Sequence, residues 1–420
     1  MAGMRTARRI LAGGAVLAAA GWALREVPAE LGMRPLRSGP DRVARIRRSA
    51  QFRDGAFVNP MPGAATVPSG PPVSMLGEFA QDREQRHPAG PIPLRIPPAD
   101  APPADGVRAV WYGHASTLVE IEGRRVLFDP VWSRRVSPTR FVGPKRHHPV
   151  PVELNELPEV DAIAISHDHY DHLDMATVRR LNRTQKAPFI VPLGIGAHLE
   201  RWGVAAYRII ELDWDEEAEV AGLRFAATAA RHFSGRTLSR NDTLWGSWVV
   251  AGPTKRVFYA GDSGYFEGYR GIGSKHGPFD LTLMPIGAYS PAWPDIHMNP
   301  EEAVNAHLDL GGKLLLPVHW ATFTLALHPW AEPVDRLWRE AKARDVRIAV
   351  PRPGEAVDAS AAPPRSRAGG RCSPESSPAQ RHDVEFGREQ PGTGPPRDPL
   401  HRRPGRRARH RGGRGGRPGA

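Results

Sequence analysis

Cysteine is almost missing from this sequence. Cys372 is the only cysteine in 420 residues. A disulfide within the chain is therefore excluded, and a metal site or nucleophile built on thiolates is disfavoured. Any metal that this chain binds must be held by histidine and carboxylate side chains.

Outside its C-terminal end, the chain has no large excess of positive charge. Its formal net charge is +12, but residues 359–420 alone hold 14 arginines against five acidic residues. The rest of the chain is nearly neutral, so we do not expect nucleic acid as a partner. A solvated, disordered basic tail is favoured over a tail that binds RNA or an anionic membrane.

A long apolar run is missing as well. Residues 10–24 carry no charge, but they fall short of the about 20 residues that a membrane-spanning helix needs. Arg5, Arg8 and Arg9 precede this run, as in a signal peptide. We predict that residues 1–27 are a signal peptide or an uncleaved membrane anchor, and that the protein is membrane-associated or exported.

The composition divides the remaining chain into three parts. Residues 28–105 are rich in proline and arginine, and we predict an arm that lies over the domain. Residues 106–358 are predicted to form a hydrolase domain, and residues 359–420 a basic tail. Strand-like runs dominate the first half of the domain and alternate with helical segments in the second half. This order predicts the α/β (α+β) class, with two sheets packed face to face and helices outside: a single catalytic domain with the αββα sandwich.

Individual elements follow from local patterns. Asn299 and Pro300 are typical of a helix start, because asparagine caps a helix and proline fits its first turn. Other helices are expected from Asp174, over Ile195–Trp202 and over Pro333–Arg344. Strands are expected at the apolar runs Arg108–Tyr112, Thr117–Ile121, Arg125–Phe128, Ala162–Ser166, Phe189–Val191, Leu223–Ala229, Trp248–Ala251, Arg256–Tyr259, Leu281–Met284, Leu314–Val318 and Arg347–Val350.

The strongest chemical signal is an HxHxDH motif directly after a predicted strand. His167 and His169 lie two residues apart, so on extended backbone their side chains point the same way. The chain then turns, which directs Asp171 and His172 to an adjacent position. Four such groups without a metal are disfavoured, because their desolvation and mutual repulsion are costly. The motif therefore predicts a two-metal loop.

Three further candidates follow later predicted strands: His232, Asp262 and His319. Each of them alone is more typical of a structural residue than of a ligand. Together with the HxHxDH loop they complete two metal sites that share one carboxylate. The glycines on either side of Asp262 let the backbone come close to the metals.

The order of these motifs resembles the metallo-β-lactamase superfamily, and within it the N-acyl-phosphatidylethanolamine-hydrolysing phospholipases D. The resemblance extends over about Val107 to Gly354 and departs from that family around Pro291–His297. It is carried by the metal motifs and by the segments Gly113–Ser116, Phe128–Pro130, Gly143–Arg146, Leu157–Ala162, Leu244–Trp248, Gly277–Leu281, Pro285–Tyr289 and Pro300–Ala303.

The resemblance implies an αββα fold, commonly dimeric, with two Zn²⁺ ions. It implies that a hydroxide between the metals attacks phosphorus, so that an N-acyl-phosphatidylethanolamine yields phosphatidic acid and an N-acylethanolamine. The expected partner is a phospholipid or small phosphodiester at a membrane surface. One zinc is assigned to His167, His169 and His232. The other is assigned to Asp171, His172 and His319, and Asp262 bridges the two.

Residues near the metal motifs have weaker assignments. His297 is a candidate catalytic contact to the phosphate or the leaving group, with a plain loop histidine as the alternative. His114 and Asp129 are interpreted as groups that support the metal loop from behind. Lys145–His148 is interpreted as a solvated loop rather than a headgroup-steering site. Four aromatic side chains fit either a lipid entry or core packing: Trp132, Phe141, Trp293 and Trp330.

Other functions stay open at this point. The same scaffold serves lactonases and nucleases, because a two-metal centre acts on many electrophiles. Manganese, iron or another divalent transition metal also suits histidine and carboxylate ligands. A non-catalytic anchored protein with a binding tail is disfavoured by the complete ligand set.

Overall fold

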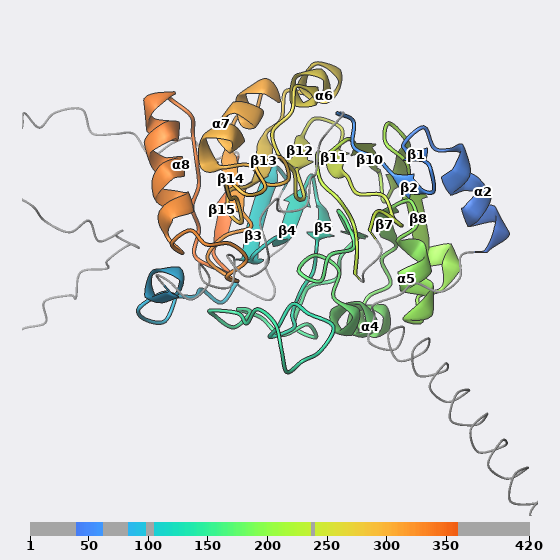
Figure 1. Ribbon diagram of the computed structural model, residues 1–420, viewed down its shortest axis with the longest axis horizontal. Coiled ribbons are helices and arrows are strands. Elements are labelled where there is room, and N and C mark those ends of the chain that lie inside the picture. Colours follow the sequence, from blue (N-terminus) through green and yellow to red (C-terminus); the bar gives the residue numbers. More distant parts are fainter. Residues whose placement is uncertain (1–38, 62–82, 98–104, 237–239, 360–420) are drawn as a thin grey trace, which may run out of the picture. The chain divides into compact units, whose positions relative to one another are not determined.

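Two β-sheets form the centre of the chain, as the computed structural model shows (Figure 1). The first has seven strands in the order β15-β3-β4-β5-β6-β7-β8, and the second has six in the order β14-β13-β12-β11-β10-β9. The strands of the first sheet are β3 Val107–Gly113, β4 Ser116–Ile121, β5 Arg124–Phe128, β6 Ala162–Ala164, β7 Phe189–Pro192, β8 Ile209–Leu212 and β15 Ala356–Asp358. Those of the second are β9 Glu217–Val220, β10 Leu223–Thr228, β11 Ser247–Ala251, β12 Arg256–Tyr259, β13 Leu281–Pro285 and β14 Leu315–Val318.

The structure describes residues 39–61, 83–97, 105–236 and 240–359. The predicted signal or anchor segment, residues 1–27, lies outside them, as do residues 360–420 of the predicted tail with Cys372. Within the described ranges, no helix combines the length and apolar character needed to cross a membrane.

Most parallel strand pairs are joined by helices, as is usual for crossover connections, and the parallel pair of β5 and β6 is joined by residues 129–161 without a helix. In the first sheet, α4 and α5 follow β6 and β7, and in the second, α6 and α7 follow β12 and β13. Figure 1 shows α4 beside the first sheet and α6, α7 and α8 beyond the second. The helix bounds are α2 Pro40–Arg48, α4 Met175–Thr184, α5 Gly196–Arg201, α6 Gly268–His276, α7 Pro300–Asp309 and α8 Glu332–Ala343, with short 3₁₀ turns at Arg83–Arg86 and Ala206–Arg208.

The alternation of side chains in β3 explains the layers. Ala109 and Trp111 face the cluster that also contains Phe225 and Phe258 of the second sheet. Val110 and Tyr112 face the other way, into a cluster with residues of α4 and α5. Successive residues of a strand point to opposite faces, so one sheet is covered by its partner sheet on one side and by helices on the other. The predicted αββα sandwich is confirmed.

Two element predictions have different outcomes. The helix start at Asn299 is confirmed: its side chain accepts a hydrogen bond from the backbone N–H of Glu302, and the Glu302 side chain accepts one from the backbone N–H of Asn299. The predicted strand Arg347–Val350 is wrong. Only Ile348 forms an isolated bridge there, and the strand that ends the first sheet is β15.

The predicted N-terminal arm contributes ordered structure. Helix α2 and the short hairpin of β1 Phe52–Arg53 and β2 Ala56–Phe57 precede the two sheets. Ile46 and Phe57 are buried in one apolar cluster with Trp214 and Trp245 of the domain. This part of the arm is therefore built into the domain rather than attached to its outside.

Candidate metal centre

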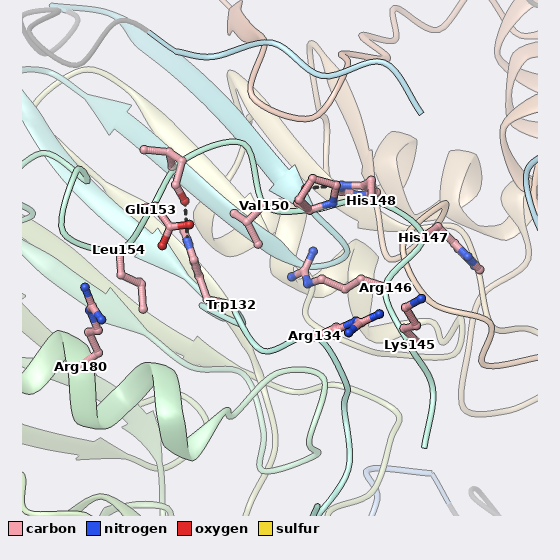
Figure 2. Close-up of a pocket in the computed structure, with 12 residues that line it drawn as sticks. Trp132, Arg134, Lys145, Arg146, His147, His148, Val150, Glu153, Leu154 and Arg180 are labelled. Carbon is pink, nitrogen blue, oxygen red and sulfur yellow. Dashed lines mark hydrogen bonds between the residues drawn. The ribbon is translucent and has the colours of Figure 1, made fainter. Parts of the chain in front are cut away.

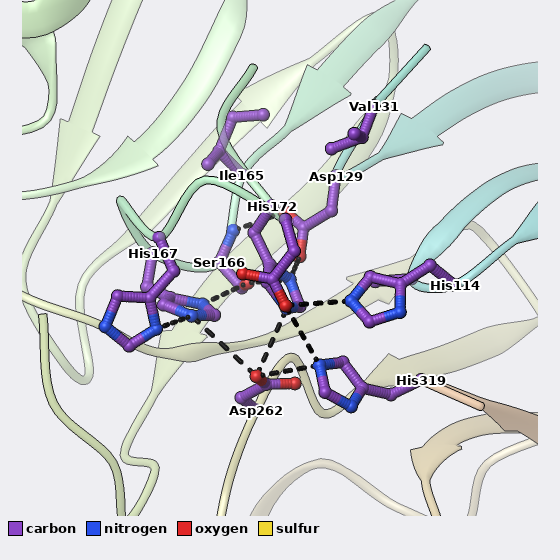
Figure 3. A network of polar contacts seen from close by, with 12 residues as sticks. His114, Asp129, Val131, Ile165, Ser166, His167, His172, Asp262 and His319 are labelled. Carbon is purple, nitrogen blue, oxygen red and sulfur yellow. Dashed lines mark hydrogen bonds and ion pairs between the residues drawn. The ribbon is translucent and has the colours of Figure 1, made fainter. Parts of the chain in front are cut away.

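All candidate metal ligands lie in loops that begin at the end of a strand. The HxHxDH loop begins three residues after β6, and His232, Asp262 and His319 come after β10, β12 and β14. Figure 3 shows the side chains of His167, His172, Asp262 and His319 gathered around one point. The structure thus brings together residues from four separate segments of the chain.

The first cluster consists of three histidine rings whose nitrogens face one another. Nε2 of His167 lies 2.9 Å from Nδ1 of His169, and Nε2 of His232 lies 3.3 Å from that same atom. Burial, with help from the neighbouring rings, lowers the pKa of His167 and His232 well below the usual value. These rings are therefore neutral, which is the state in which imidazole binds a metal.

The second cluster joins Asp171 to three histidines. Its Oδ2 lies 2.9 Å from Nε2 of His114, 3.3 Å from Nε2 of His319 and 3.6 Å from Nε2 of His172. Asp171 is only partly buried, whereas the three rings are buried. The cluster therefore offers one more nitrogen than the ligand set implied by the family resemblance.

Asp262 lies between the two clusters. Its Oδ2 is 3.1 Å from Nε2 of both His172 and His319, and 3.8 to 3.9 Å from Nε2 of His232 and His167. Burial acts to raise the pKa of this carboxyl, but His172 and His319 hold it well below its usual range. A carboxylate in this position can bridge two cations.

The donor set fits two divalent metal ions. Tetrahedral zinc ligands at about 2.0–2.1 Å from the metal are ~3.3 Å from one another, close to the spacing of the first cluster. Among the described residues, Nε2 of His172 and Oδ1 of Asp262 are buried and make no hydrogen bond. Such atoms are costly unless they have a partner, and a bound cation supplies one.

Asp129 orients the second cluster from behind. This fully buried carboxylate accepts hydrogen bonds from Nδ1 of His172 at 2.6 Å and from the hydroxyl of Tyr259 at 2.6 Å. It also accepts bonds from the backbone N–H of Ser166 at 2.7 Å and from its hydroxyl at 2.5 Å. With Nδ1 engaged, His172 presents Nε2 to the metal position.

Several residues of the centre have positive φ angles, which residues other than glycine rarely adopt. The φ angles of His114, Asp129 and His319 are 53°, 38° and 62°. Gly261, just before Asp262, has φ +59°, and a Cβ added there would lie 2.6 Å from Cβ of Ser166. Strain of this kind is typical of functional sites, where the surrounding structure maintains it.

His297 lies at the edge of the centre. Its Nδ1 is 3.8 Å from Oδ2 of Asp262, and its ring centroid is 5.1 Å from that of His232. Nδ1 has no hydrogen-bond partner among the described residues. The ring is therefore free to contact a ligand that enters the site.

Two supporting residues have no signal in the sequence motifs. Asn59 of the arm accepts a hydrogen bond from the backbone N–H of His232 at 2.9 Å and donates one to its carbonyl at 2.7 Å. Arg236 donates to the carbonyls of Asp168 and Leu173 at 2.6 and 2.7 Å, so it holds both ends of the metal loop. Neither contact is local in sequence, and no periodicity points to them.

Comparison with known proteins gives consistent similarities. Residues 124–320 match the profile of the Beta-lactamase superfamily domain. An uncharacterized protein of Mycobacterium tuberculosis is 52% identical over 84% of this chain and 96% of that protein. N-acyl-phosphatidylethanolamine-hydrolyzing phospholipase D 1 of Caenorhabditis elegans is 38% identical over 57% of this chain and 71% of that protein. The mitochondrial enzyme of that activity in Saccharomyces cerevisiae is 32% identical over 54% of this chain and 50% of that protein.

Proposed function

This chain belongs to the metallo-β-lactamase superfamily, and on that premise we propose that it is a zinc-dependent phosphodiesterase of phospholipase D type. It is a metal-dependent hydrolase, as its similarity to relatives with hydrolase names indicates. The proposed substrate is an N-acyl-phosphatidylethanolamine or a related lipid phosphodiester, cleaved to phosphatidic acid and an N-acylethanolamine. The relatives from C. elegans and S. cerevisiae carry this activity in their names.

The position of Asp262 carries the proposal. Its Oδ2 is within 3.1 to 3.9 Å of one ring nitrogen on each of four histidines from both clusters. We assign Asp262 as the bridging ligand of a two-metal site. One zinc would be held by His167, His169 and His232, and the other by Asp171, His172 and His319.

When bound, two such ions lower the pKa of a water molecule towards neutrality and stabilise negative charge on phosphate oxygens. Groups around the centre hold the metal-binding histidines in place. Asp129 fixes the ring of His172 through Nδ1. The carbonyl of Ile296 accepts a hydrogen bond from Nδ1 of His232 at 2.9 Å and fixes that ring. His297 is assigned as a contact to the phosphate or to the departing alcohol.

An apolar cluster beside the first three histidines supports a lipid substrate. Phe233 packs against it, and the Phe233 ring lies 4.5 Å from the ring of His169. Phe233, a partly buried ring at the edge of this cluster, would contact an acyl chain whose phosphodiester reached the metals. The cluster itself consists of Ala288, Trp293, Ile296 and Ala326.

The segment before Gly143 supports contact with a membrane surface. Phe141 and Val142 are each 72% exposed, and the guanidinium of Arg140 lies 4.9 Å from the Phe141 ring. Apolar side chains next to basic ones are typical of segments that insert at the lipid interface. Of the four aromatic residues that fit either a lipid entry or core packing, Phe141 is exposed and Trp293 is buried.

The test is a substrate panel with the purified full-length chain: N-acyl-phosphatidylethanolamine, bis(p-nitrophenyl) phosphate, an acyl lactone and RNA. We expect zinc by elemental analysis and cleavage of the first substrate. Asp262→Asn should abolish hydrolysis, and Asp215→Asn, at an exposed site, serves as the matched control. Turnover of the lactone without cleavage of N-acyl-phosphatidylethanolamine or bis(p-nitrophenyl) phosphate would refute the proposal. Cleavage of RNA alone would refute it as well.

A further inference from the structure

A second cavity lies apart from the metal centre. It has a volume of about 490 Å³ and is lined by residues between Trp132 and Leu154 and by Arg180 of α4. This volume is within the range of small-molecule sites, roughly 300–1,000 Å³. None of the candidate metal ligands lines it. Figure 2 shows the residues around this space.

The cavity is strongly cationic. Arg134, Lys145, Arg146 and Arg180 line it, and Glu153 is the one carboxylate in the lining. His147 and His148 also line it, but burial lowers the pKa of each to about 4, so they add no charge at neutral pH. An anion is therefore the ligand that this lining favours.

Arg146 is the residue that points most clearly to a ligand. Its side chain is buried, with a relative exposure of 7%, which contradicts the prediction of a solvated loop for this residue and for the buried His148. Nε donates to the carbonyl of Ser133 at 3.2 Å, and Nη2 donates to the carbonyl of Val131. Nη1 has no hydrogen-bond partner among the described residues. The guanidinium lies 5.0 Å from the Phe323 ring, and the negative charge of Asp174 acts on it without a direct hydrogen bond.

The fixed guanidinium remains charged. Burial lowers the pKa of Arg146 to about 10, so the group is protonated at neutral pH. Asp174 offsets part of the cost of burying this charge, and an anion in the cavity would offset more of it. In Figure 2 the guanidinium points towards Trp132 and Val150, which give the cavity an apolar wall.

We propose that this cavity is a second ligand site, which binds a phosphate-type oxyanion through Arg146, Arg134 and Lys145. Trp132 and Val150 would contact an apolar part of the same ligand. The anion can come from free phosphate or from the phosphomonoester headgroup of a lipid. The site is independent of the reaction assigned to the metal centre, since the two share no residues.

The test is ¹⁹F NMR of the metal-loaded protein labelled with 5-fluorotryptophan, in which Trp132→Phe assigns the resonance of Trp132. The probes are inorganic phosphate and dioctanoyl phosphatidate. We expect both probes to shift the Trp132 resonance in a saturable way. Binding of phosphatidate at least about tenfold tighter than phosphate would identify a lipid headgroup, and equal affinities would identify free phosphate.

A double variant at the two exposed cations Arg134 and Lys145 tests the binding site. Arg134→Gln with Lys145→Gln should weaken binding of either probe about tenfold, because two charges near the anion are lost. The matched control is Arg339→Gln with Lys342→Gln on α8, which removes the same charge from another exposed surface. Arg146→Gln should abolish the shift of the Trp132 resonance. Cooperative unfolding of this variant would show that it is still folded. A Trp132 resonance that neither probe moves, or equal affinities in the two double variants, would overturn the proposal.

Discussion

The side chain of Asn59 pairs with both backbone groups of His232, 173 positions later in the chain. One side-chain amide thus fixes the backbone on both sides of the Cα of His232, a candidate ligand of the first cluster. An asparagine side chain has one acceptor and one donor group, which match a backbone N–H and carbonyl. The arm therefore takes part in forming the metal centre.

Replacing Asn59 by alanine should weaken both the fold and the metal site. Two partly buried hydrogen bonds are lost, at about 1 kcal/mol each in the free energy of unfolding. Zinc affinity should fall as well, because the backbone at His232 is released. Denaturant unfolding and competition with a zinc chelator measure the two effects. Asn155→Ala, at an exposed site, is the control, and an unchanged zinc affinity in Asn59→Ala would contradict the assigned role.

Asp129→Asn should destabilise the protein strongly, by about 3–5 kcal/mol. The amide keeps the size of the side chain but turns one acceptor oxygen into a donor, opposite hydrogen-bond donors from Ser166, His172 and Tyr259. Thermal and denaturant unfolding check this expectation. An unfolding free energy within about 1 kcal/mol of that of Asp215→Asn, which is exposed, would show that the network contributes little.

Removal of the metal should lower the melting temperature. A ligand that binds only the folded state stabilises it by about 4 kcal/mol at roughly 1,000 times its dissociation constant. Calorimetry of the protein with EDTA, and again after zinc is restored, should show a reversible shift. Asp262→Asn should show a smaller shift, because the bridging carboxylate is gone. A melting temperature that EDTA leaves unchanged in the unsubstituted protein argues against a bound metal.

Stability should fall at acidic pH through buried histidines outside the metal centre. Burial lowers the pKa of His307 from 6.5 to about 4, so the unfolded state binds a proton more readily than the folded state. The stabilisation is complete above pH 6.5 and is lost as the pH falls towards 4, by about 2 kcal/mol between pH 7 and pH 5. Guanidinium unfolding of His307→Gln at both pH values should show a smaller difference than the unsubstituted protein. Equal differences in the two proteins would show that His307 does not contribute.

The sequence predicts those parts that depend on local patterns. The metal loop is six residues long, and each further candidate follows an apolar run, so the order of residues alone is enough to predict the fold class and the candidate ligands. The roles of Asn59, Arg236 and the buried Arg146 could not be predicted in this way. They depend on contacts between distant segments, and an asparagine or arginine in a loop has no periodicity that reveals its partner.

The strand at the end of the first sheet illustrates the same limit. Arg347–Val350 is predicted as the final strand, but the final strand of the structure is β15, which follows it in the chain and pairs with β3. Local propensity favours extended conformation in both segments. The first lies beside β14, where Ile348 forms one isolated bridge to Leu315, and the second lies along the edge of β3 and pairs with it over three residues.

The burial of Ile46 and Phe57 against Trp214 and Trp245 has a practical consequence for anyone who expresses this enzyme in pieces. A fragment cut at residue 106, where the sandwich begins, would leave two tryptophans facing water and the backbone of His232 without its amide. The smallest unit worth purifying starts before Pro40 and runs through Asp358. It then keeps α2 and the β1–β2 hairpin, which cover the tryptophans, and β15, which pairs with β3.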